Sequence, residues 1–146
     1  MELLPIQQQL EDNQEFIKNP DCNDSLQMTI NFYKKAGFNP PWISYYAALH
    51  GELVGCAAFV GQPKNNRVEI AYSVFPEHQH KGIGTRIAKA LVRLAQEIDP
   101  TVTIIAHTLP EENYSTKILR KNHFKVIGTA IDDDEGEVWE WAYESK

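Results

Sequence analysis

The spacing of apolar and polar side chains divides the chain into strand-like and helix-like segments. Residues 68–74 alternate between large apolar side chains and small or polar ones, which is typical of a strand. Over residues 82–98, apolar side chains recur every three or four positions opposite a charged face, which predicts an amphipathic helix. A short β-branched strand follows at 102–106. Because a helix separates these two strands, we expect them to be parallel.

Weaker patterns and turn residues complete an α/β order: strand, two helices, three strands, helix, strand, helix, two strands. The Gly51 connection is short and predicts a hairpin between its flanking strands. The acidic run at 132–135 is interpreted as a solvated turn between the last two strands. The remaining predicted elements are a strand at 1–6, a helix ending before Pro20, a helix at 23–36, strands at 43–50 and 53–60, a helix at 112–121, and strands at 124–131 and 138–143.

Composition narrows the class of protein. The 146 residues are the size of one ordinary domain, so we expect a single domain over residues 1–146. No apolar run approaches the roughly 20 residues that span a bilayer, so no membrane partner is expected. The N-terminal residues lack the features of a secretory signal, and two cysteines make no disulfide framework, so the cytoplasm is the expected location. The net charge of −6 argues against nucleic acid and is compatible with a cationic amine substrate.

The segment with the clearest chemistry is Gln79-His80-Lys81-Gly82-Ile83-Gly84-Thr85, at the start of the 82–98 helix. A helix N-terminus presents unpaired N–H groups and a partial positive charge, so it can hold an anion. Glycines at 82 and 84 are expected to let a phosphate approach these amides, and Lys81 and His80 add charge at the rim. The pattern lacks the P-loop Gly-Lys-Ser/Thr, and Ile87 stands where a dinucleotide fingerprint needs a small residue. A plain strand-to-helix turn is the alternative interpretation.

This segment, with its strand before and helix after, resembles the GNAT superfamily of acyl-CoA-dependent N-acyltransferases, whose signature is Gln/Arg-x-x-Gly-x-Gly/Ala. A second block is similar to the last-helix motif of the branch that acetylates ribosomal-protein N-termini: Leu109-Pro110-Glu111, Ser115, Leu119, Lys121 and Phe124. The resemblance covers roughly residues 43–143. It implies a mixed, mainly antiparallel sheet of six or seven strands with helices on both faces. It also implies an N-acetyltransferase in which a primary amine attacks acetyl-CoA directly.

The resemblance further implies how coenzyme A is held. The thioester arm would lie between the 67–74 and 102–108 strands, which splay apart, and backbone groups of Val74 and Phe75 would pair with its pantetheine amides. Amides from Gln79 to Thr85 would hold the pyrophosphate. The expected cofactor-binding residues are Val74, Phe75, Gln79, His80, Lys81, Gly82, Ile83, Gly84, Thr85 and Asn113.

Two positions depart from that branch. Its pantetheine-contacting asparagine is replaced by Glu112, with Asn113 one place later. Its glycine after the last helix is replaced by His123, so the helix must end on Asn122 or His123 in a left-handed conformation.

Acetyl transfer to an amine needs a proton acceptor for the amine and a proton donor for the departing sulfur. Glu69 is the candidate base, because it shares the small-residue face of the 67–74 strand with Ala71 and Ser73; an exposed carboxylate is the alternative. Ser115 is the candidate donor, and a hydroxyl bonded to its own helix is the alternative. Tyr114 is the fallback donor, because Arg120 stands where many GNAT enzymes carry a catalytic tyrosine.

Other features leave the acceptor open. The histidines lack a ligand cluster, so no metal is expected. His107 could contact the acceptor or be a surface residue, and Trp42 could shape the acceptor pocket or pack in the core. A monomer or a homodimer is compatible with the sequence. The alternative function is a non-catalytic acyl-CoA-binding sensor, which would keep the Gly82 turn without needing Glu69 or Ser115.

Overall fold

The computed structural model describes residues 1–144 and confirms the predicted α/β order of elements. The strands are β1 (Glu2–Pro5), β2 (Ser44–Leu49), β3 (Glu52–Phe59), β4 (Arg67–Val74), β5 (Thr103–Thr108), β6 (Phe124–Asp132) and β7 (Gly136–Tyr143). The helices are α1 (Gln14–Ile17), α2 (Asn23–Ala36), α3 (Ile83–Ile98) and α4 (Tyr114–Lys121), with short 3-10 turns at Leu10–Asp12, Pro20–Cys22 and Pro76–His78.

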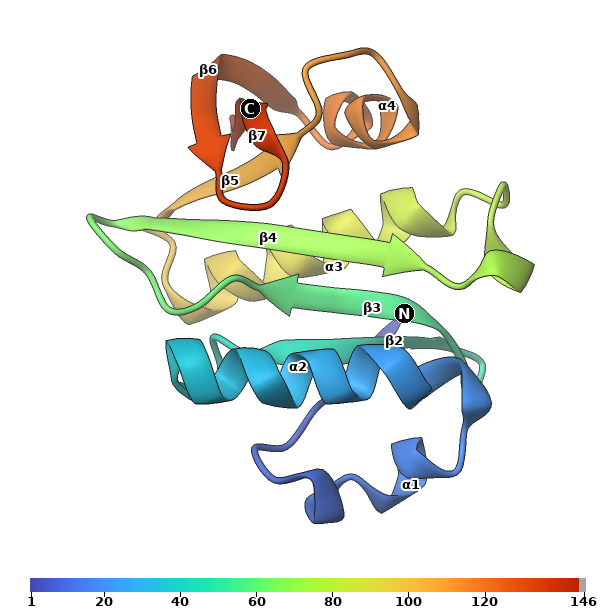
Figure 1. The fold of residues 1–146 in the computed structure, drawn as a ribbon. Helices are drawn as coiled ribbons and strands as arrows, with labels where there is room; N and C mark the ends of the chain where they lie inside the picture. The colour runs from blue at the N-terminus through green and yellow to red at the C-terminus, as the bar shows by residue number, and fades with distance from the viewer. Residues whose placement is uncertain (145–146) are drawn as a thin grey trace.

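The strands form one seven-stranded sheet in the order β1-β2-β3-β4-β5-β7-β6. Every neighbouring pair is antiparallel except β4 and β5, as the helical crossover between them required. Helix α2 lies in front of β2 in Figure 1, and α3 lies behind β4 on the other side of the sheet. The mixed, mainly antiparallel sheet with helices on both faces is therefore confirmed.

Local residue chemistry explains the turns and the helix ends. His50 and Gly51 both have positive φ, 52° and 83°, and they form the predicted hairpin connection between β2 and β3. In the β6–β7 turn, the Asp132 side chain accepts hydrogen bonds from the N–H groups of Asp134 and Glu135, at 2.8 and 3.0 Å. His123 has φ 67°, so it supplies the left-handed end of α4 that the missing glycine demanded.

The core is built where both helices press on the sheet. On α3, Ile87, Leu91 and Ala95 are fully buried at helical spacing, and they pack in the same cluster as the inward side chains of β4. Helix α2 is tied to the first two strands by Tyr33, whose hydroxyl donates to the Ile6 carbonyl at 2.9 Å. These contacts fix the orientation of β4, the strand on which the site is built.

The two halves of the sheet meet along a very short seam. Strands β4 and β5 pair at only three positions: Arg67 with Thr103, Val68 with Ile104, and Glu69 with Ile105. Beyond Glu69, β5 leaves β4 and pairs with β7, and Figure 1 shows the two strands diverging toward the C-terminal end of β4. Half of one edge of β4 is therefore left without a partner strand.

Candidate active site

The unpaired edge of β4 presents backbone groups to the gap. The Phe75 N–H donates to the Val54 carbonyl at 2.9 Å, so the backbone of Phe75 faces β3. Backbone direction alternates along a strand, so Tyr72 and Val74 direct their N–H and C=O groups toward the gap. The Gln79 side-chain amide already donates to the Val74 carbonyl at 3.1 Å. The Phe75 N–H and carbonyl are both engaged within the protein, the carbonyl by the His78 N–H at 2.9 Å, whereas the backbone of Tyr72 faces the gap beside Val74.

A cavity of about 360 Å³ lies at this gap. It brings together Val74, Gln79, His80 and Ser115, which the sequence had placed at the cofactor and the leaving sulfur. His80 and Tyr114 both line it, and their rings are tilted by 51° to each other with centroids 6.2 Å apart. Residues from β4, the loop before α3 and the first turn of α4 thus line a single space.

Tyr72 is a cavity residue that the sequence analysis missed. It lies on the apolar face of β4, where its ring resembled a packing residue, but it lines the cavity together with Ser115. Burial raises the pKa of the Tyr72 phenol, so the hydroxyl keeps its proton. The only available signal was its position two residues before Val74 on the strand next to the predicted cofactor.

Helix α3 begins beside this cavity without a side-chain cap. Its N-cap residue is Gly82, at φ 76°, and the Arg86 N–H makes a bond back to the Gly82 carbonyl at 3.4 Å. The N–H groups of Ile83, Gly84 and Thr85 precede that bond and have no carbonyl one turn earlier in the helix. Three donors at a positive helix end are an arrangement that binds anions.

Backbone conformation and packing explain the two glycines of this segment. At Gly82 an added Cβ would meet nothing within 4 Å, so the left-handed backbone requires the glycine there. At Gly84 an added Cβ would lie 2.6 Å from Ile118 Cδ1 and 3.5 Å from Val74 Cγ2. Gly84 is therefore needed for close packing of α3 against α4.

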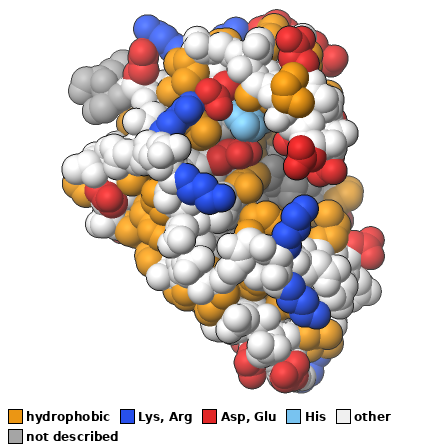
Figure 2. Space-filling view, turned by 60° about the vertical axis from the view of Figure 1, so that its left-hand side comes forward, with side chains coloured by type: hydrophobic (Ala, Val, Ile, Leu, Met, Phe, Trp, Pro, Cys, Tyr) orange, Lys and Arg blue, Asp and Glu red, His pale blue; other side chains and the backbone are white. Residues whose placement is uncertain are grey.

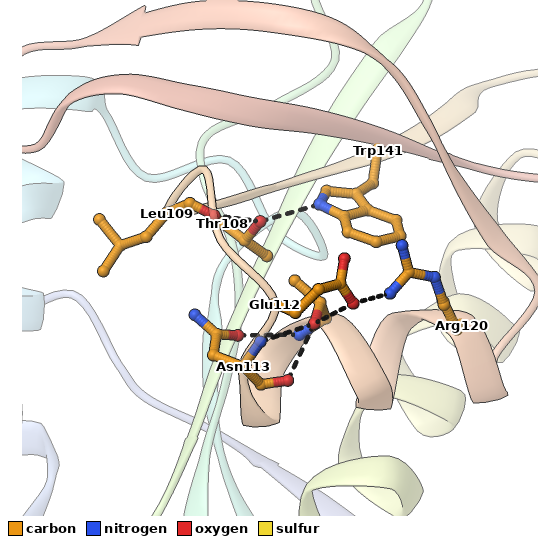
Figure 3. Close-up of polar contacts among 7 residues, drawn as sticks. Thr108, Leu109, Glu112, Asn113, Arg120 and Trp141 are labelled. Carbon is orange, nitrogen blue, oxygen red and sulfur yellow. Dashed lines mark hydrogen bonds and ion pairs between the residues drawn. The ribbon is translucent and has the colours of Figure 1, made fainter.

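Asn113 caps α4. Its Oδ1 accepts from the Thr116 N–H at 3.0 Å, and Thr116 Oγ1 accepts from the Asn113 N–H at 2.9 Å, as Figure 3 shows. This capping box starts the helix at Tyr114, two residues later than expected. Asn113 is not among the residues that line the cavity, so its expected cofactor role is not supported.

Arg120 points away from the cavity. Its guanidinium forms an ion pair with Glu112 and lies 5.0 Å from the centre of the buried Trp141 ring. The Trp141 indole N–H donates to Thr108 Oγ1 at 2.9 Å. The position that resembles a catalytic tyrosine site therefore holds a residue that joins α4 to β7.

Glu69 lies at the last β4–β5 pair, where the strands begin to separate. Its Oε2 is 3.4 Å from Nδ1 of His107 on β5, and His107 Nε2 is 3.0 Å from Oε2 of Glu140 on β7. Arg67 Nη2 lies 2.8 Å from the other oxygen of Glu140. His107 is therefore half-buried and held between two carboxylates. Figure 2 shows a histidine bordered by acidic side chains.

The surroundings of Glu69 set its basicity. Burial raises the pKa of Glu69 above its ordinary value, His107 partly opposes this, and Asp132 and Glu140 add to the increase. For Glu140, burial acts in the same upward direction, but hydrogen bonds from His107 and Arg67 hold its pKa below the ordinary value. Two carboxylates that share one imidazole thus differ: Glu69 is the better proton acceptor.

Glu69 opens onto a second cavity, of about 550 Å³, on the α2 side of the sheet. Ser73, which lines the first cavity, is four positions from Glu69 on β4, or about 13 Å along an extended strand. The candidate base, Glu69 of β4, and the candidate acid, Ser115 of α4, therefore line different cavities.

Within residues 1–144 no group of His, Cys, Asp or Glu side chains is arranged to hold a metal ion. Across the same residues, no helix combines the length and the apolar character needed to cross a bilayer.

Comparison with known proteins bears on this geometry. A family model described as an acetyltransferase (GNAT) domain matches residues 1–125. No match was found among curated proteins. Among solved structures, a variant of spermidine N-acetyltransferase SpeG from Vibrio cholerae is 15% identical, with 98% of this chain and 94% of that chain covered and a TM-score of 0.73.

Two further structures share the fold. RimL, a ribosomal L7/L12 alpha-N-protein acetyltransferase, is 17% identical, with 96% of this chain and 90% of that chain covered and a TM-score of 0.66. Aminoglycoside acetyltransferase AAC(6')-Ib in complex with coenzyme A is 23% identical, with 68% of this chain covered and a TM-score of 0.59. The chain spans 64% of that protein's length.

Proposed function

The chain belongs to the GNAT acetyltransferase family, and from this premise we propose that it transfers an acetyl group from acetyl-CoA to a primary amine. The observation that carries the proposal is the 360 Å³ cavity, in which the free edge of β4, the loop before α3 and Ser115 meet. We further propose that residues 1–146 act as one catalytic domain.

The residues present fit acetyl-CoA. Ile83, Gly84 and Thr85 offer uncapped N–H groups for the pyrophosphate, and the exposed Lys81 adds positive charge beside them. The backbone groups of Tyr72 and the N–H of Val74 can pair with the amides of an extended pantetheine arm, as an added strand would, and the Gln79 side chain would have to release the Val74 carbonyl for that group to join them. This support comes from the shape and the hydrogen-bonding capacity of the chain itself.

When bound, acetyl-CoA supplies a thioester whose acetyl group passes to the amine nitrogen as the thiol departs. Glu69 accepts the proton that the amine loses, directly or through a water. The raised pKa of Glu69 favours this role, because a base is more effective when its pKa is closer to that of the group it deprotonates. His107 holds the carboxylate at the end of the β4–β5 seam.

Ser115 donates a proton to the departing sulfur from the first turn of α4. Tyr72 can supply the same proton, because its phenol lines the same cavity and stays protonated; Tyr114, which is more exposed, is the fallback. A covalent enzyme intermediate is not part of the proposal, since burial raises the pKa of the Cys56 thiol and keeps it unreactive.

The acceptor is a protein N-terminus or a small amine. An α-amine, with a pKa of about 8, is neutral far more often at pH 7 than a lysine amine, with a pKa of about 10.4. A base of moderate strength such as Glu69 suits the α-amine better. We therefore place a peptide or protein α-amine first and a small primary amine second.

The test is the substitution Glu69→Gln, assayed by thiol release from acetyl-CoA with a panel of amines. We expect kcat to fall by about 10²- to 10³-fold, while the acetyl-CoA Kd measured by calorimetry stays unchanged. Glu97→Gln, an equal charge change at an exposed position of α3, serves as the control. An unchanged kcat in Glu69→Gln would show that the base is elsewhere. Binding of acetyl-CoA without transfer to any amine would favour the sensor function.

A further inference from the structure

The cavity on the α2 side of β4 has walls of opposite charge. Glu69 lies in its wall next to the seam. Lys35, from the last turn of α2, and Lys64, from the β3–β4 turn, line the same cavity. Neither lysine forms an ion pair within residues 1–144, whereas the third cation of the lining, Arg67, is paired with Glu140.

The charges therefore separate into two poles. The negative pole consists of Glu69 and Glu140 with His107 between them, and Asp132 of β6 adds to its field. The positive pole consists of Lys35 and Lys64. Figure 2 views this side of the molecule and shows Lys and Arg side chains near the acidic side chains that border the histidine. A ligand with a cationic and an anionic end matches both poles.

We propose that the acceptor is a peptide N-terminus with acidic side chains directly after it, whose amine lies at Glu69 and whose carboxylates contact Lys35 and Lys64. The inference rests on the proposed function and specifies its substrate class. A polyamine would place a second cation against the lysines, which disfavours it. The cavity, at about 550 Å³, is large enough for several residues of an extended chain.

The net charge of the protein does not oppose this proposal. At −6 the molecule repels anions at long range, but salt screens that repulsion beyond about 8–10 Å. Contact with Lys35 and Lys64 acts within that distance. The positive charges of Lys35 and Lys64 therefore distinguish acidic from basic acceptors once these have reached the cavity.

A matched control separates acceptor binding from helix stabilisation. Lys34 and Lys35 both lie in the last turn of α2, where cations interact favourably with the helix dipole. Only Lys35 lines the cavity. Lys34→Glu therefore reproduces the effect of Lys35→Glu on the helix and on net charge without changing the cavity.

The experiment compares equal-length peptides with a free α-amine and with acidic, neutral or basic residues at positions two to four, together with spermidine and free glutamate. We expect kcat/KM for the acidic peptide to exceed that for the basic peptide by roughly tenfold or more, from two exposed contacts. The double variant Lys35→Glu/Lys64→Glu should reverse this preference, whereas Lys34→Glu should stay within about twofold of the parent. As a readout independent of transfer, calorimetry of the acidic peptide with the protein alone should show weaker binding to the double variant.

The outcomes separate the inference about acidic peptides from the proposed acetyl transfer. Preference for the basic peptide or spermidine, or equal effects of the double variant and Lys34→Glu, would overturn the inference and leave acetyl transfer intact. Glutamate reacting as well as the acidic peptide would replace the peptide with a free amino acid. If no amine is acetylated, the proposed function fails, and the calorimetric arm alone then tests the charge-matched cavity.

Discussion

Gly84→Ala offers the sharpest test of how the cavity is built, because it adds one methyl group at the contact between α3 and α4. The new Cβ would lie 2.6 Å from Ile118 Cδ1. Carbon atoms in contact prefer about 3.5–4.0 Å, so one helix must move by roughly 1 Å or the isoleucine must leave its rotamer. Ile118 lines the 360 Å³ cavity, so the displacement reaches the cofactor site.

Overpacking of this kind costs about 1–3 kcal/mol. Alanine has a better helix propensity than glycine by up to about 1 kcal/mol, which offsets part of the cost. We therefore expect the free energy of unfolding to fall by about 1–2 kcal/mol. For a domain of this size, each kcal/mol corresponds to about 2–4 °C in Tm.

The assay is a double-mutant cycle with Ile118→Val, which removes the clashing Cδ1 atom and by itself costs about 0.5–1.5 kcal/mol. In urea denaturation, the double variant should be more stable than the sum of the single effects by about 1 kcal/mol. The acetyl-CoA affinity lost in Gly84→Ala should return with it. Additivity within about 0.5 kcal/mol would refute the packing role of Gly84.

Three further predictions concern the cap, the base and the acid. Asn113→Ala should lower the free energy of unfolding by about 1 kcal/mol without changing the acetyl-CoA Kd, whereas Asn113→Asp, which retains the cap, should remain near the parent. In the pH profile, kcat should fall as acidification passes the pKa of Glu69, which burial raises. His107 lowers this pKa, so in His107→Asn the acidic limb of the profile should move to higher pH. An acidic limb that does not move would contradict the pairing of Glu69 with His107. Ser115→Ala should reduce kcat by about tenfold or more in single-turnover assays, while Tyr114→Phe should change it by less than about twofold; the reverse ranking would move the acid to Tyr114.

The elements that position the site could be predicted from the sequence because their signals are local. The alternating pattern of β4 and the apolar stripe of α3 do not depend on the rest of the chain, and the helix between β4 and β5 imposes their parallel pairing. The end of α4 at His123 was also predictable, since few residues tolerate positive φ.

The parts that escaped prediction depend on contacts between distant segments. Gly84 suggested anion access, and only the position of Ile118, more than thirty residues later, gives its packing role. His107 has no local pattern that reveals its carboxylate partners, which come from two other strands. The backbone direction at Phe75 could not be predicted, because it depends on the register of β4 with β3, which the sequence leaves open.

Only three residue pairs between β4 and β5 join the strands β1-β2-β3-β4 to the strands β5-β7-β6, so the two parts of the sheet can separate at this seam. A pantetheine arm hydrogen-bonded to Tyr72 and Val74 would act as an inserted strand, so bound acetyl-CoA would also stabilise the association of the two parts of the sheet. Amide hydrogens of β5, β7 and β6 would then exchange more slowly once the donor binds. In each catalytic cycle, the strands β5, β7 and β6 would then become less tightly held when the donor leaves. Release of coenzyme A would begin when its hydrogen bonds to β4 break.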